Sequence, residues 1–344
     1  MKILALETSC DETAAAIVED GVKEVCSVVA SSREFHEETG GIVPEVAARK
    51  QVEFIIPVLD NIVKKFSDKA DTNTSIDYAR ENIDMLAVTV GPGLIGSLLV
   101  GVEAAKALSL AWEKSLIPVN HLVGHIYANW VDAEDLPEFP SLALVVSGGH
   151  TDLVLMGGHG DLIYLGGTLD DAVGEAFDKT ARLLGLSKYL GGPELSRLAS
   201  TCKDNKAIGV LPRPLLDSDK YDLSFSGLKT AVKRLIEKDI YPPDVIACEF
   251  ENAVVDVLVS KSIKAAKEYK VKSLLLGGGV SANLQLRTRI KNEAANIGVK
   301  THIPPLHLCT DNAVYIASAA YFNNHPRNLS EIDADSSLGI IDIV

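Results

Sequence analysis

One short pattern occurs twice in the sequence: two apolar segments separated by a turn. The first copy joins Lys2–Glu7 to Thr13–Val18, and the second joins Leu142–Val146 to Thr151–Met156 through a Ser-Gly-Gly turn. Apolar runs of this length with turn residues between them are typical of β-hairpins. Because the unit recurs, we expect a weak internal duplication, with one hairpin in each of two lobes.

Strands and helices alternate around these hairpins, which favours two α/β lobes with mixed sheets and a ligand cleft between them. Acidic residues and prolines between Trp130 and Pro140 mark a boundary, so we expect lobes at 1–131 and 132–311, with about 312–344 packing back on the first. Polar Ser67–Asn82 is predicted to be mostly a surface excursion. Helices are expected at Glu45–Phe66, Ile95–Trp112, Asp170–Leu184, Phe225–Glu237, Asp244–Tyr269, Ala282–Ala295 and Asp311–Asn323, and further strands at Asp84–Val90, Leu116–Val119 and Ser273–Leu276.

Composition excludes several classes of protein. The 344 residues carry 33 Lys+Arg against 47 Asp+Glu, a formal charge of −14, and 47% are hydrophobic. Such a chain folds, and its acidity argues against non-specific coating of nucleic acid. We expect no apolar run of the ~18 residues that cross a bilayer, and no signal-type segment at the N-terminus. Five scattered cysteines favour reduced thiols, so we expect a cytoplasmic protein without membrane association.

The sharpest local motif is Asn120-His121-Leu122-Val123-Gly124-His125. Asn120 is a good helix cap, which would place His121 and His125 one turn apart on the same face, where two imidazoles can share a divalent metal. A metallopeptidase would need Glu in place of Leu122 as its general base. The simplest alternative is a pair of helix histidines that binds no metal.

Two glycine-rich turns form a second kind of signal. Ser147-Gly148-Gly149 lies between two strands, and Gly277-Gly278-Gly279 lies between a strand and a helix. Glycine allows backbone amides to approach a phosphate, although Gly-Gly also makes ordinary hairpin turns. Neither segment fits GxxxxGK[ST] or GxGxxG. Two such turns in one lobe shift the balance towards nucleotide binding.

Longer blocks of sequence carry a family resemblance. In order, they are ETSCDET, GGIVPEVAAR, GPGLIGSLLVG, NHLVGH, VSGGHT, DDAVGEAFDK, SFSGLKTA, GGGVSANLQLR and CTDNA. Over about residues 1–320 the chain resembles the TsaD/Kae family of tRNA N6-adenosine threonylcarbamoyltransferases, once described as O-sialoglycoprotein endopeptidases. The resemblance implies the actin/hexokinase/Hsp70-like fold, with two ribonuclease-H-like lobes around a nucleotide and metal cleft. It implies transfer of a threonylcarbamoyl group from threonylcarbamoyl-AMP to the adenosine just 3′ of the anticodon, in tRNAs reading ANN codons.

Site residues follow from the same resemblance. It implies one divalent metal, with Fe²⁺ favoured and Zn²⁺ possible. We nominate Glu12, beside Asp11, as a proton acceptor or orienting group. The implied metal ligands are His121, His125 and Asp311, where Thr310 would cap the following helix; the implied substrate and nucleotide contacts are Val145, Val146, Ser147, Gly148, Gly149, Asp178, Gly192 and Asn283.

Partners are also implied by the family. We expect tRNA as substrate, a TsaB-like paralogue, a TsaE-like ATPase, and adenylate from a TsaC-type synthase. A competing hypothesis is a non-catalytic scaffold of the same fold, which would have lost the metal ligands. Because the chain is acidic, we expect tRNA to bind through local basic residues: Arg33, Arg49 and Lys50 are predicted to face it, and Lys229, Lys233 and Arg234 form a smaller group in the other lobe.

Overall fold

The structure is a computed structural model that describes residues 1–69, 71–203, 209–342 and 344. It divides into two compact units: Met1–Leu136 with Pro305–Val344, and Pro137–Pro304. The chain thus returns to the first unit at Pro305. This places Asp311 in the first unit, whereas the division expected from the sequence assigned it to the second.

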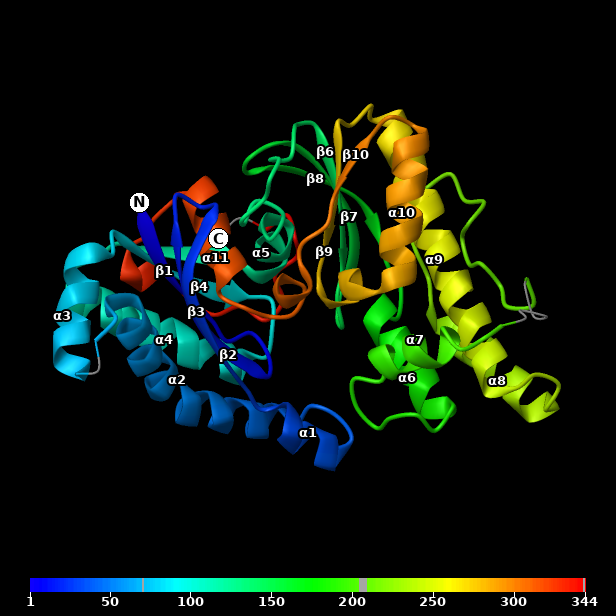
Figure 1. The fold of residues 1–344 in the computed structure, drawn as a ribbon, viewed down its shortest axis with the longest axis horizontal. Helices are drawn as coiled ribbons and strands as arrows, with labels where there is room; N and C mark the ends of the chain where they lie inside the picture. Colours follow the sequence, from blue (N-terminus) through cyan, green and yellow to red (C-terminus); the bar gives the residue numbers. More distant parts are fainter. Residues whose placement is uncertain (70, 204–208, 343) are drawn as a thin grey trace. The chain divides into compact units, whose positions relative to one another are not determined.

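The first unit is built on a five-stranded mixed sheet (Figure 1). The expected opening hairpin is confirmed, since its first two strands are antiparallel neighbours. A third antiparallel strand follows on one side, and two parallel strands extend the other side. In sheet order these strands are β3 (Lys23–Ser31), β2 (Glu12–Glu19), β1 (Lys2–Glu7), β4 (Met85–Gly91) and β5 (Leu116–Asn120).

Helices cover both faces of this sheet, so its central strands are buried on both sides. Alternate residues such as Leu4 and Leu6 belong to the core beneath the α2–α4 pair, while α11 contacts β1, β2, β4 and β5. The helices are α1 (Arg33–Thr39), α2 (Pro44–Ser67), α3 (Thr72–Asn82), α4 (Ile95–Trp112), α5 (His121–Tyr127) and α11 (Val314–Phe322).

Two sequence-based predictions were wrong here. Most of the supposed surface excursion is helix α3, which packs on α2, is capped by Asp71 and buries Ser75 and Ala79. The segment was mistaken for a loop because its sequence is mostly polar and only a narrow face of the helix is buried. Helix α4 is also long and apolar enough to cross a membrane, contrary to expectation, but it contacts α2 and β4 and buries Leu98 and Val102 as a core helix does.

The second unit repeats the topology of the first. The expected hairpin of β6 and β7 is confirmed, β8 continues it antiparallel, β9 pairs parallel to β6, and β10 pairs parallel to β9. The order β10-β9-β6-β7-β8 therefore matches β5-β4-β1-β2-β3, which confirms the duplication. The strands are β6 (Ser141–Val146), β7 (Thr151–Gly158), β8 (Asp161–Gly167), β9 (Ser273–Gly277) and β10 (Lys300–His302).

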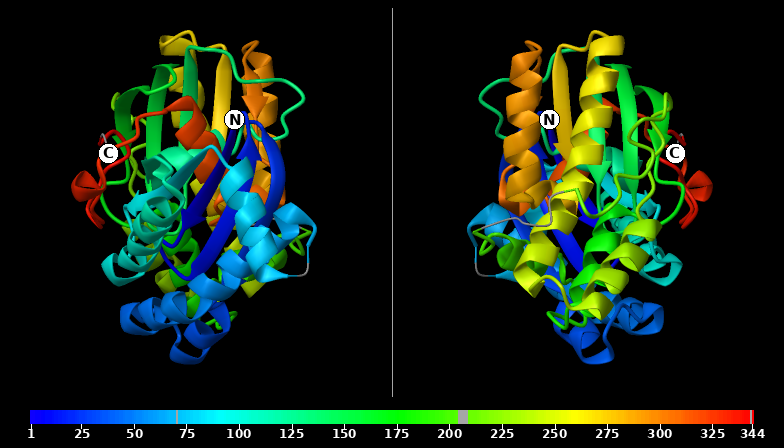
Figure 2. Two further views of the ribbon diagram at one scale, coloured as in Figure 1. Left: turned by 90° about the vertical axis from the view of Figure 1, so that its left-hand side faces the viewer. Right: turned by 90° about the vertical axis from the view of Figure 1, so that its right-hand side faces the viewer.

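Helices of the second unit enclose a separate core around the same kind of sheet. Helices α9 and α10 pack against each other, and both can be followed in Figure 2 (right, yellow and orange). Helix α8 packs on α6 and α9. The helices are α6 (Val173–Leu183), α7 (Gly192–Ala199), α8 (Ser226–Lys238), α9 (Pro243–Glu268) and α10 (Leu284–Asn296), with the 3₁₀ turn η1 at Gly279–Ala282.

Candidate functional site

Helix α5 presents two histidines on one face, at the end of β5. The expected cap is confirmed: Asn120 Oδ1 accepts hydrogen bonds from the backbone amides of Leu122 and Val123. Both His121 and His125 are buried, and their ring centroids lie 4.6 Å apart. The capped helix start therefore fixes the direction of both imidazoles.

Asp311 joins the two histidines within the first unit. Its Oδ1 lies 3.6 Å from His121 Nε2 and 3.5 Å from His125 Nε2. The aspartate precedes α11, whose first turn is capped by Asn312 Oδ1 through the amides of Val314 and Tyr315. The expectation that Thr310 caps this helix and that Asp311 lies within it was therefore wrong.

This cluster has the spacing that a shared metal requires. One ligand atom from each of His121, His125 and Asp311 can be chosen so that all lie within 4.8 Å of one another. Tetrahedral ligands at about 2.0–2.2 Å from a metal lie about 3.4 Å apart, close to the two separations given above. Two imidazoles and one carboxylate also suit Fe²⁺ or Zn²⁺ and leave coordination positions for a substrate.

Glu7, at the end of β1, is a site residue that the sequence analysis missed. Its Oε2 lies 2.9 Å from His121 Nδ1 and accepts a 2.6 Å hydrogen bond from Thr89 Oγ1. A carboxylate at Nδ1 orients the ring and leaves Nε2 to a metal. An acidic residue ending a fully buried strand was the signal available in the sequence.

The charges of the cluster shift one another's pKa values. Burial favours neutral His121, but Glu7 and Asp311 outweigh burial and raise its pKa to about 9. Burial of Glu7 acts in the opposite direction from the facing His121, which prevails and lowers the pKa of Glu7. Burial, with Glu7 and Asp11 nearby, raises the pKa of Asp311 to about 6 despite His121. A metal would have to displace the His121 proton.

Glu12 is the first residue of β2 and Asp11 precedes it, and both are close enough to influence the cluster electrostatically. Glu12 accepts a 3.1 Å hydrogen bond from Ser31 Oγ. Burial, followed by the adjacent Asp11, raises the pKa of Glu12 to about 10. A carboxyl with this pKa carries its proton at neutral pH and is poorly suited to accept another.

In the second unit, the two glycine-rich turns follow neighbouring parallel strands. Val145 pairs with Gly277 at the ends of β6 and β9. Ser147 closes the β6–β7 turn, because its amide and its Oγ both bond to the backbone of His150. The amide of Gly174, in the first turn of α6, donates to Ser147 O. Val145, Val146 and the turn are thus brought beside the start of a helix, where an anion is favoured.

The glycines of these turns differ in what the fold requires. At Gly278, φ is +86° and an added Cβ would lie 2.4 Å from Val146 O, so the fold itself demands glycine. At Gly148 and Gly149, φ is not positive and an added Cβ would meet nothing within 4 Å. The fold itself therefore does not require glycine at either of these two positions.

The remaining predicted nucleotide contacts are held by internal hydrogen bonds. Asp178 Oδ1, on α6, accepts a 3.0 Å bond from the amide of Gly192 at the start of α7, and burial raises the pKa of Asp178. Asn283 caps α10 through Leu286 N, while its Nδ2 donates to Ser196 Oγ and Glu251 Oε1. The structure thus gives Asn283 a structural role, with both amide hydrogens already engaged.

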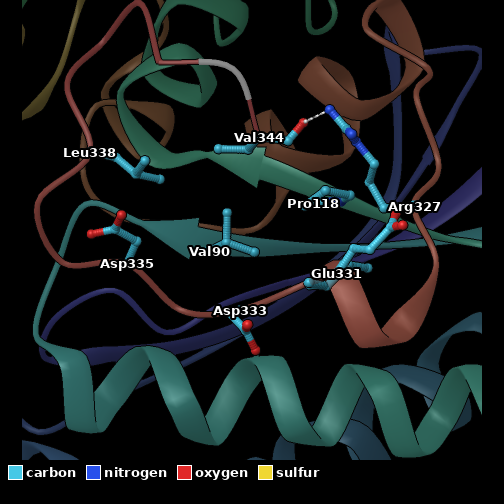
Figure 3. Close-up of a pocket in the computed structure, with 9 residues that line it drawn as sticks. Val90, Pro118, Arg327, Glu331, Asp333, Asp335, Leu338 and Val344 are labelled. Carbon is cyan, nitrogen blue, oxygen red and sulfur yellow. Dashed lines mark hydrogen bonds between the residues drawn. The ribbon is translucent and has the colours of Figure 1, made fainter.

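A further cavity of about 300 Å³ lies in the first unit, beneath the C-terminal segment (Figure 3). Its lining includes Val90, Pro118 and Arg327, and Arg327 Nη2 donates a hydrogen bond to the backbone oxygen of Val344. None of its lining residues is among the predicted ligands or nucleotide contacts.

Comparison with solved structures identifies the class of fold. The chain matches HypF of T. kodakarensis with a TM-score of 0.62 at 15% identity, covering 94% of this chain and 47% of that one. It matches component A of the Acidaminococcus fermentans (R)-2-hydroxyglutaryl-CoA dehydratase with a TM-score of 0.51 at 14% identity, covering 93% and 96%. Together with the duplicated mixed sheets, these matches place the chain in the actin/hexokinase/Hsp70-like class.

Sequence comparison identifies the family. Residues 23–318 match the family described as TsaD, tRNA N6-adenosine threonylcarbamoyltransferase. Relatives bearing that description include one from Dehalococcoides mccartyi, 50% identical with 97% of each chain covered, and one from Bacillus subtilis, 50% identical with 93% of this chain and 89% of the relative covered. The chain belongs to the TsaD family.

Proposed function

We propose that the protein transfers the threonylcarbamoyl group of threonylcarbamoyl-AMP to the N6 amine of the adenosine just 3′ of the anticodon, releasing AMP. Family membership supports this activity. The observation that carries it in the structure is the cluster of His121, His125 and Asp311, in which both Nε2 atoms approach one carboxylate oxygen.

In this proposal, His121, His125 and Asp311 hold one divalent metal, Fe²⁺ or Zn²⁺. When bound, such an ion acts as a Lewis acid towards a carbonyl group. Glu7 keeps His121 in the tautomer whose Nε2 is available. Gly148 and Gly149 admit the phosphate of the adenylate close to the backbone, and Asp178 contacts its ribose.

Glu12 is assigned an orienting role. Its raised pKa leaves it protonated at neutral pH, so it can donate a hydrogen bond to an incoming group. The incoming adenosine amine loses its proton as the new N–C bond forms, and the departing AMP phosphate is a ready acceptor for it. Asp11 is proposed to hold Glu12 in its protonated form.

The proposal also includes the partner proteins and the cellular location of the enzyme. We expect a TsaB-like paralogue, a TsaE-like ATPase and a TsaC-type synthase that supplies the adenylate, all in the cytoplasm. Exposed apolar residues on two adjacent helices support docking of a partner: Val52 and Ile56 on α2, and Leu99 on α4, are each close to half exposed or more.

The two alternative functions are less well supported. A metallopeptidase of the HExxH type needs a glutamate where this chain has Leu122. A non-catalytic scaffold would have no reason to keep the three metal-binding side chains in register.

Depletion of the protein, followed by mass spectrometry of anticodon-loop nucleosides, tests the function. We expect threonylcarbamoyladenosine to disappear and to return on expression of the wild type, but not of His125→Ala. His159→Ala, at an exposed histidine in the β7–β8 turn, is the matched control and should restore it. Unchanged nucleosides after depletion would contradict the proposal, and elemental analysis of purified His125→Ala should show loss of the metal.

A further inference from the structure

The acidity of the chain is confined to one of its two units. The first unit, Met1–Leu136 with Pro305–Val344, has 12 Lys+Arg against 27 Asp+Glu, a formal charge of −15. The second unit, Pro137–Pro304, has 21 Lys+Arg against 20 Asp+Glu, a charge of +1. A polyanion is therefore repelled by the first unit and tolerated by the second.

Within the second unit, basic side chains gather on one side of α8. Leu228, Val232 and Leu235 are buried, and the helix packs on α6 and α9 (Figure 1, yellow-green). The opposite side, which we call the α8 basic face, consists of Lys229, Lys233, Arg234 and Lys238, all exposed.

Few acids neutralise this face. Lys233 has one ion pair, a 3.8 Å contact with Glu237 in which both side chains are more than half exposed. Within the part of the chain that the structure describes, Lys229, Arg234 and Lys238 form no ion pair. Charges without an acidic partner remain available to phosphates.

Three basic residues of the first unit were predicted from the sequence to face the RNA, but each of them forms an ion pair. Arg33 Nε lies 3.0 Å from Glu37, Arg49 Nη2 lies 2.7 Å from Glu45, and Lys50 Nζ lies 2.7 Å from Glu53. Each is paired with a glutamate one helical turn away, so the group carries little net positive charge.

The dimensions of the α8 basic face suit a nucleic-acid strand. At 1.5 Å per residue, Lys229 and Lys238 are separated by about 13 Å along the helix, roughly the length of two to four successive phosphates. Gly227, at the start of the same helix, is exposed and an added Cβ would meet nothing within 4 Å. Because it has no side chain, Gly227 leaves this end of the face open to a large ligand.

We propose that the α8 basic face contacts the phosphate backbone of the tRNA substrate. The proposal rests on the proposed function for the identity of the RNA. It assigns the RNA contact to the second unit, and it replaces the expectation placed on Arg33, Arg49 and Lys50.

Equilibrium binding of tRNA to the isolated chain, measured from 50 to 200 mM salt, tests the proposal. The variant Lys229→Ala/Lys233→Ala/Arg234→Ala should bind on the order of tenfold more weakly at 50 mM, and its salt slope should fall by about 2 to 3. The control variant Arg33→Ala/Arg49→Ala/Lys50→Ala removes the same formal charge and should bind within about twofold of the wild type. Melting temperature and AMP binding should be unchanged in both variants.

Three outcomes would overturn the proposal. These are an equal loss of affinity in both triple variants, no binding of tRNA by the wild type at 50 mM salt, or equally effective competition by polyglutamate, which would indicate a surface for acidic proteins. The binding assay needs neither metal, adenylate nor group transfer. If the nucleoside experiment failed while the α8 variant alone lost RNA binding, the proposed function would fall and the RNA-binding surface would remain.

Discussion

Gly149 is a residue whose backbone and surroundings would accept a larger side chain, and this makes it a clean probe of ligand binding. Val at this position projects into open space in the protein itself. We expect Gly149→Val to shift the melting temperature by less than about 2 °C, because such surface changes cost under about 0.5 kcal/mol. We expect it to weaken adenylate binding at least about tenfold, measured by calorimetry, because a side chain excludes the phosphate.

Gly278→Ala provides the opposite case. Its φ is +86°, and the Cβ of an alanine would lie too close to Val146 O, so alanine is strained there. We expect a loss of about 2 kcal/mol or more in the free energy of unfolding.

For the first of these two variants, one result would contradict the prediction. If Gly149→Val bound adenylate normally, the β6–β7 turn would be structural only.

Asp152, on β7, gives the stability of the second unit a pH dependence. Burial raises the pKa of Asp152 to about 6, although a hydrogen bond from Tyr164 opposes the shift. Because the folded pKa exceeds the unfolded one, the stabilisation is fully present below about pH 4 and is lost as the pH rises through 6. Asp152→Asn should remove this dependence, worth about 3 kcal/mol, in urea unfolding at pH 4 to 8. Tyr164→Phe should move the midpoint to higher pH, and an unchanged profile in both variants would contradict the assignment.

At the scale of elements, α5 has only seven residues and depends on its cap to aim two histidines. Asn120 Oδ1 caps the helix, while Nδ2 donates to Gly339 O in the C-terminal segment. We expect Asn120→Ala to cost about 1–2 kcal/mol and to lower metal affinity, measured by competition with a chelator. Asn120→Asp keeps the capping oxygen but loses the donor. It should therefore recover most of the metal affinity; equal affinity in all three proteins would show that the cap does not position the histidines.

Elements marked by local patterns could be predicted from the sequence. Both hairpins and α5 were recognised because turn residues and a cap act on their immediate neighbours. Helix α3 was missed because only Ser75 and Ala79 of its polar sequence are buried. Glu7 was missed because its role depends on His121, 114 residues away in sequence. The placement of Asp311 beside the histidines came from resemblance, and local pattern could not supply it.

At the scale of the whole molecule, the net charge of −14 limits how strongly the chain can bind RNA. At physiological salt the Debye length is ~8 Å, so charges farther than this from the RNA are largely screened. Only basic residues in close contact with the RNA then contribute to attraction. We expect the isolated protein to bind tRNA weakly, with a shallow salt slope of about 3 to 4, and a partner subunit to complete the basic surface. Filter binding across a salt series checks this, and tight binding with a steep slope by the chain alone would show that no partner is needed.

The return of the chain to the first unit at Pro305 means that the three side chains proposed to hold the metal are made at different times. At about 5–20 residues per second, a ribosome adds Asp311 roughly 10–40 s after His125. Helix α11, which contacts β1, β2, β4 and β5, is made later still. During that interval the nascent polypeptide presents two imidazoles without their carboxylate, a poor chelator. An ion held by all three side chains can therefore bind only after Asp311 has been made.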